Sequence, residues 1–95
     1  MTTYPKVTAV EPLPGKRLRV TFANGAIRIY DCTPLLREQP FRLLSEETFF
    51  RTVHADTHGY GVMWHDEVDL AESELWIHGM TERATAPDAA EGRAQ

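Results

Sequence analysis

The sequence predicts an α+β domain: a small antiparallel sheet of two hairpins plus an N-terminal strand, with short helices. Polar and apolar residues alternate over 17–22 and again over 26–31, which is the period of a half-buried strand. Asn24-Gly25 lies between the two runs and is a strong hairpin signal, because both residues readily adopt positive φ. Pro34 and Pro40 restrict the next segment to short helical turns.

A two-residue loop at Asn24-Gly25 would fix which residues of this hairpin face each other. The strand before it, Val7–Leu13, is expected to end at its prolines, which cannot donate ladder hydrogen bonds. The predicted pairs are Phe22 with Ile27 and Val20 with Ile29 on the core side, and Arg19 with Tyr30 and Thr21 with Arg28 on the outer side, where Arg17 is in line.

The middle of the chain is expected to hold two short helical turns and a second strand pair. Thr33 is placed as the N-cap of the first turn and Ser45 as the cap of the second. Residues 52–56 and 61–65 are predicted to pair, with His58 in or near the turn between them. The buried face of this pair would carry Val53, Ala55, Val62 and Trp64.

The acidic stretch between Trp64 and Trp76 is interpreted as the start of a helix and not as a catalytic site. It holds five carboxylates and one histidine. Asp69 followed by Glu72 resembles a capping box in its aspartate version, in which carboxylates accept hydrogen bonds from the first-turn amides. Asp66 is assigned to the preceding turn.

The length of 95 residues predicts one domain, placed at 1–80, and a disordered tail at 81–95 that lacks periodicity. No apolar run approaches the ~18 residues that span a bilayer, and the N-terminus lacks the apolar core of a signal peptide. We therefore expect a cytoplasmic protein without membrane contact. Cys32 is the sole cysteine and is interpreted as a buried structural thiol rather than a nucleophile.

The formal net charge of −4 is divided unevenly along the chain. Residues 1–44 hold seven Lys/Arg and three Asp/Glu, a net of +4, whereas residues 45–95 hold three and eleven, a net of −8. The acidic total argues against nonspecific nucleic-acid binding, while the basic half can meet an acidic partner and the acidic half a basic one. The structural alternative is that the halves face each other or solvent.

The first candidate surface is the outer side of the hairpin, where Arg17, Arg19, Arg28 and Tyr30 are expected to lie together. Basic side chains beside an aromatic ring can dock an acidic protein surface, and they can also hold phosphate or stack bases. The structural alternative is a cross-strand cation–π pair of Arg19 with Tyr30. As a functional surface, we expect it to bind a protein partner rather than nucleic acid.

The second candidate set is His54, Asp56, His58 and His65. Alternate strand positions project from one face, so the first three would align and His65 on the paired strand could join them. Histidines with a carboxylate suit zinc or iron. The structural alternative is a solvated face that ends in a turn at Gly59. We expect no metal and no cofactor, and keep this set as the alternative.

A series of short motifs follows a fixed order from residue 7 to residue 76. The most specific is W-x4-D-[LI] after a Val-rich strand, here Trp64 followed by Asp69-Leu70. In this order and spacing the chain resembles the bacterial family catalogued as domain of unknown function 2442. Many members place Asn-Gly after the tryptophan, where this chain has 65–68, HDEV. The other matching residues are Val7, Val10, Leu13, Leu18, Val20, Phe22, Gly25, Asp31, Pro34, Leu35, Leu36, Phe41, Leu44, Phe50 and Leu75.

This resemblance implies a small α+β domain with an antiparallel sheet and no established enzymatic activity. Some relatives carry an added C-terminal helix-turn-helix, for which this chain has no room, so DNA reading by that route is not expected. Genes of the family often lie beside those of another small family, a layout similar to toxin–antitoxin pairs. The resemblance therefore implies a protein partner encoded by a neighbouring gene.

Together these observations predict a protein–protein interaction module, as a toxin–antitoxin-like accessory partner, and not an enzyme. The hairpin is the expected working surface, because it is basic in an acidic protein. Homodimerisation through an exposed strand edge stays open. The alternative function is a metal-binding protein or small enzyme that uses the histidine set.

Overall fold

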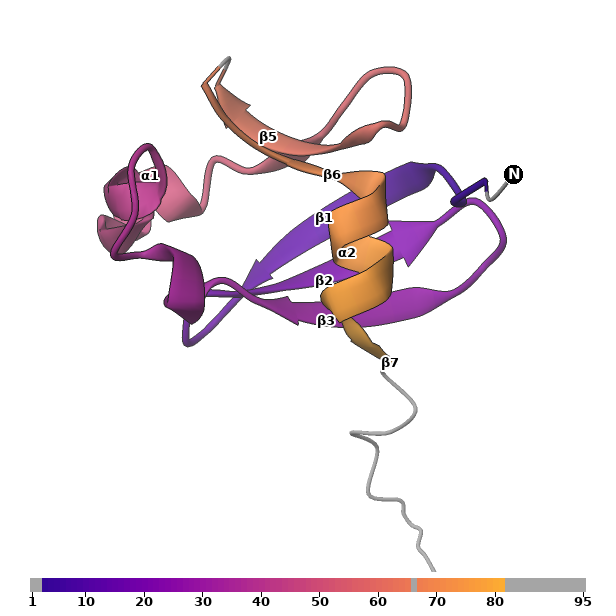
Figure 1. Cartoon of the computed structure of the whole chain (residues 1–95), viewed down its shortest axis with the longest axis horizontal. Helices are drawn as coiled ribbons and strands as arrows, with labels where there is room; N and C mark the ends of the chain where they lie inside the picture. The colour runs from indigo at the N-terminus through magenta and orange to yellow at the C-terminus, as the bar shows by residue number, and fades with distance from the viewer. Residues whose placement is uncertain (1–2, 66, 82–95) are drawn as a thin grey trace, which may run out of the picture.

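The structure is a computed structural model that describes residues 3–65 and 67–81. It contains two antiparallel sheets and short helices, which confirms the predicted α+β class (Figure 1). The first sheet has the order β1 (Val7–Leu13), β2 (Arg17–Phe22), β3 (Ile27–Asp31), β7 (Met80–Thr81). The second has the order β4 (His54–Ala55), β5 (Gly61–His65), β6 (Val68–Ala71). The helices are the 3₁₀ turns η1 (Thr33–Leu35) and η2 (Phe41–Ser45), and α1 (Glu47–Phe50) and α2 (Glu72–His78).

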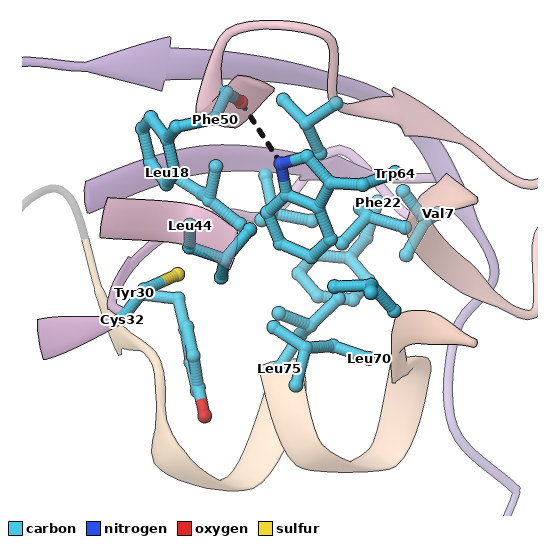
Figure 2. Close-up of a cluster of buried hydrophobic side chains, with 14 residues drawn as sticks. Val7, Leu18, Phe22, Tyr30, Cys32, Leu44, Phe50, Trp64, Leu70 and Leu75 are labelled. Atoms are coloured by element: carbon cyan, nitrogen blue, oxygen red, sulfur yellow. Dashed lines mark hydrogen bonds between the residues drawn. The ribbon is translucent and has the colours of Figure 1, made fainter. Parts of the chain in front are cut away.

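Helix α2 covers one face of the first sheet (Figure 1). We call this side of the sheet the inner face. The core lies between this face, α2, the second sheet and the α1 region, and Figure 2 shows its side chains. The indole N–H of Trp64 donates a buried hydrogen bond of 2.9 Å to the carbonyl oxygen of Phe50, which ties β5 to the end of α1. Of the predicted second-pair face, Val53, Val62 and Trp64 are buried and Ala55 is half-buried.

The predicted register of the first hairpin is wrong by one residue, because the loop has three residues and not two. The N–H of Phe22 donates to the carbonyl of Ala26, and the N–H of Gly25 donates to the carbonyl of Phe22. Gly25 has φ +89°, as the last position of a three-residue hairpin loop requires. Asn24 accepts a hydrogen bond from the N–H of Ala26 with its side-chain oxygen. The observed pairs are Leu18 with Tyr30, Arg19 with Ile29, Val20 with Arg28 and Thr21 with Ile27.

The predicted capping box at Asp69 is also wrong. Asp69 lies in β6 opposite Met63, and α2 begins at Glu72, with Ala71 as an N-cap that makes no side-chain hydrogen bond. Strand pairing decides this outcome, because it buries Val68 and the residue two positions later on one side of β6 and turns Asp69 outward. Asp66, which the sequence places in the turn, lies outside the described residues.

Neither predicted cap of the short helical turns is used. Cys32 is the N-cap of η1, and Glu46 is the N-cap of α1, and neither makes a capping hydrogen bond through its side chain. The hydroxyl of Thr33 donates instead to the Asp31 carboxylate at 2.8 Å. Pro34 does occupy the first turn of η1, as its fixed φ favours.

The described chain ends in β7, which lies along β3. Thr81, assigned by the sequence to the tail, pairs with Arg28, and Met80 pairs with Ile29. The rest of the predicted tail, 82–95, lies outside the described residues. Across residues 3–65 and 67–81, none of the helices has the length and apolar character that a bilayer crossing requires.

Cys32 is fully buried in the core, as predicted. Burial, with a smaller contribution from the Asp31 carboxylate, raises the pKa of its thiol from 9.0 to about 12. A thiol that keeps its proton at neutral pH is a poor nucleophile, so Cys32 has a packing role.

Gly61→Ala should destabilise the domain strongly. A Cβ atom at this position would lie 2.0 Å from the carbonyl oxygen of Leu70, at φ +150°. We expect a loss of more than about 3 kcal/mol in the free energy of unfolding, measured by chemical denaturation. Gly25→Ala is the matched control, because φ is +89° but no atom lies within 4 Å of the new Cβ. It should lose only about 1–2 kcal/mol, and equal losses in both variants would contradict the packing argument.

The free energy of unfolding should fall as pH rises from about 9 to 12, because Cys32 then ionises only in the unfolded chain. The folded-state pKa lies above the unfolded value, so this contribution is complete below pH 9 and is lost as pH approaches 12. Relative to Cys32→Ala, the native chain should lose roughly 2 kcal/mol between pH 8.5 and 10.5 in urea titrations. Parallel pH profiles for the two proteins would disprove a protected thiol.

Candidate protein interface

The side of the first sheet that faces away from α2 is the candidate site, and we call it the outer face. Strand alternation and the observed register decide which side chains lie on it. None of these residues is classed as buried. They are Ala9, Glu11 and Leu13 of β1, Arg17, Arg19 and Thr21 of β2, Ile27, Ile29 and Asp31 of β3, and Met80 of β7.

The apolar part of the outer face is made by Leu13, Ile27, Ile29 and Met80. The first three are half-buried, and Met80 is 61% exposed beside its strand neighbour Ile29. None of the four belongs to the core or to the side chains packed against it. A sheet whose second face meets water usually carries polar residues there, so this apolar group is an exception to the usual pattern.

The charges of the outer face are balanced. Arg19 forms an ion pair of 3.2 Å with Glu11 across β1 and β2. Arg17 stands opposite Asp31 on β3, and its Nε–H donates to the carbonyl of Pro14 at 3.1 Å. Two cations and two carboxylates therefore stand among the apolar side chains, which gives the surface no net charge.

The structure separates the four residues predicted to bind a partner. Arg17 and Arg19 lie on the outer face, whereas Arg28 and Tyr30 point to the inner face. The guanidinium carbon of Arg28 lies 3.7 Å from the ring centroid of Trp76 on α2. The expected cation–π pair of Arg19 with Tyr30 is wrong, since the two residues lie on opposite faces.

Tyr30 serves the core instead. Its hydroxyl donates a 2.8 Å hydrogen bond to the Glu74 carboxylate on α2. Burial and this hydrogen bond raise the pKa of Tyr30 above its ordinary range. Arg28 and Tyr30 thus hold α2 to β3, and the residues that the sequence missed are the isoleucines that alternate with them. The sequence does contain the signal for this apolar side, because Ile27 and Ile29 occupy alternate positions of β3, but only the loop length decides which side of the sheet they occupy.

The histidine set is not brought together. His54 lies in β4, and His65 at the end of β5 packs its ring against Phe49 at 5.6 Å. The Asp56 carboxylate accepts the N–H groups of Tyr60 and His58, which lowers its pKa. In the described part of the chain, no group of three or more His, Cys, Asp or Glu side chains could hold a metal ion.

A shallow hollow of about 80 Å³ lies beside the β4–β5 turn. Asp56, Asp69, Tyr60 and Met63 are among its lining residues. The Tyr60 ring is 57% exposed, and the Lys6 ammonium lies 3.8 Å from its centroid. The hollow is too small and open to enclose a substrate, because ligand pockets typically measure about 300–1,000 Å³.

Comparison with known proteins gives one informative structural relative. The Nitrosomonas europaea protein named "Putative DNA Binding Protein NE0471" is similar over 90% of this chain, with 31% identity and a TM-score of 0.65. The match covers 56% of that protein, so this chain spans little more than half its length. No protein of curated function matches the sequence.

The family model described as protein of unknown function, DUF2442, matches residues 7–79. This range runs from the first residue of β1 to the glycine between α2 and β7, so it includes the second sheet and all of the first sheet except β7. The chain belongs to the DUF2442 family.

Proposed function

We propose that this domain acts by binding another protein through its outer face, and that it has no catalytic role. The observation that supports this proposal is the apolar group of Leu13, Ile27, Ile29 and Met80 outside the core. Contiguous apolar side chains on a surface mark protein interaction sites when polar residues surround them. Here Ile27, Ile29 and Met80 are neighbours on β3 and β7, and Arg17 and Arg19 of β2 border them and separate them from Leu13.

The outer face has the composition of a protein-binding surface more than that of a phosphate-binding one. Aliphatic and Met side chains can fill the centre of an interface, and arginine is enriched at binding hot spots. Phosphate binding needs cations whose charge is not neutralised, whereas Arg19 is paired with Glu11. The family resemblance adds a candidate partner, the product of a neighbouring gene in a toxin–antitoxin-like arrangement.

Ile29→Glu should weaken binding of the neighbouring-gene product by at least about tenfold, because it places an unpaired charge at the centre of the interface. Titration calorimetry with the purified partner measures the effect. Ile77→Glu is the matched control: it makes the same change at a 56% exposed isoleucine on α2, away from the outer face. Equal affinities for both variants would exclude the outer face as the binding surface.

The name of the Nitrosomonas europaea relative makes DNA the second candidate ligand. Over the chain as a whole, the net charge of −4 opposes a polyanion. We therefore expect no shift of duplex DNA in a gel assay at about 50 mM salt, where phosphate contacts are strongest. A shift that disappears in the double variant Arg17→Glu, Arg19→Glu would replace the protein-binding proposal by a nucleic-acid one.

A further inference from the structure

We propose that, when no other protein is bound, a second copy of this chain covers the outer face in a two-fold symmetric dimer of stacked sheets. This inference rests on the proposed function, since it assigns an occupant to the same surface. Two copies that stack face to face would remove from water the half-buried Leu13, Ile27 and Ile29 together with the exposed Met80. Sheet-on-sheet packing of this kind is a common arrangement of two apolar sheet faces.

The positions of the charges favour a second copy over an unrelated partner. The sheet has four strands, so its centre lies between β2 and β3. A two-fold axis parallel to the strands at this centre lays β2 of one copy over β3 of the other, and β1 over β7. Because Arg17 and Asp31 are register partners on β2 and β3, Arg17 of each copy then faces Asp31 of the other.

The same superposition places no like charges directly opposite each other. Arg19 faces Ile29 of the second copy, since these two are also register partners. Glu11, which lies in the same row, faces Met80. An isologous interface repeats every contact twice, so the Arg17–Asp31 contact occurs at two symmetric positions. The surface is therefore complementary to itself in charge at the Arg17–Asp31 positions, while the apolar side chains of β3 and β7 of one copy lie opposite the side chains of β1 and β2 of the other.

The area of the face predicts a weak dimer. Strands about 4.8 Å apart and residues about 3.4 Å apart give a face of roughly 19 by 17 Å. This is small compared with the ~800 Å² per partner that stable complexes bury. We therefore expect a dissociation constant on the order of 10 µM, which lets a tighter partner displace the second copy.

Sedimentation equilibrium of the full chain between about 1 and 500 µM tests the dimer, because this range brackets the expected constant. We expect a reversible monomer–dimer equilibrium that Arg17→Asp and Asp31→Arg each weaken at least about tenfold. In the first variant two carboxylates face each other across the interface, and in the second two guanidinium groups do.

An equimolar mixture of the two single variants distinguishes loss of the Arg17–Asp31 contact from loss of the fold. In the mixed dimer an acid faces a base at both symmetric positions, so we expect heterodimers about as stable as the native dimer. Variants that had simply lost their fold could not recover in this way. Heterodimers no more stable than the single variants' own dimers would overturn the proposed stacking.

Two further outcomes would overturn the dimer. One is a native chain that stays monomeric over the whole concentration range. If Ile29→Glu still weakened binding of the neighbouring-gene product in that case, the result would support the protein-binding function and contradict only the dimer. The other is that a chain ending at Thr81 dimerises while the full chain does not. This result would indicate that residues 82–95, and not a second copy, occupy the outer face of the full chain.

Discussion

The three-residue loop between β2 and β3 decides what each face of the first sheet carries. Gly25 has φ +89°, and the N–H of Phe22 donates a hydrogen bond to the carbonyl of Ala26. These two features set the register of all residue pairs between β2 and β3. Because side chains alternate along a strand, a slip of one residue would exchange the two sides of β3. Tyr30 would then leave the core and lose its hydrogen bond to Glu74, and Ile29 would enter. Both the attachment of α2 and the chemistry of the outer face depend on this turn.

The sequence pattern assigns the two faces of β2 correctly and those of β3 the wrong way round, for a physical reason. In β2 the buried Leu18, Val20 and Phe22 alternate with polar residues, so its two faces are evident. Residues 27–31 read IRIYD, with aliphatic side chains on one side and an arginine and a tyrosine on the other. A strand results whether the isoleucines or Tyr30 face the core. The fold class is therefore predictable from the sequence, whereas the side chains that lie on the outer face are not.

Local helix signals fail where strand pairing competes with them. Asp69 and Glu72 have the spacing of a capping box, yet β6 extends to Ala71, because pairing with β5 buries two of its side chains. Gly61 permits this pairing, since its missing Cβ leaves room for the carbonyl of Leu70. A pattern of four residues cannot reveal a contact between strands, and for this reason the sequence predicts the helix from Asp69, whereas α2 begins at Glu72.

The arginines of the first sheet show how position decides the role of one residue type. On the inner face, Arg28 lies over Trp76, whose ring also meets Phe22 edge-on at a centroid distance of 5.1 Å. On the outer face, Arg17 and Arg19 stand beside isoleucines that no core contact requires. Apolar side chains on the side of a sheet that faces away from the core break the usual pattern, and such departures are found at functional surfaces. Because the core is complete without these isoleucines, packing within the domain does not account for them, and their position on the outer face supports the protein-binding function that we propose.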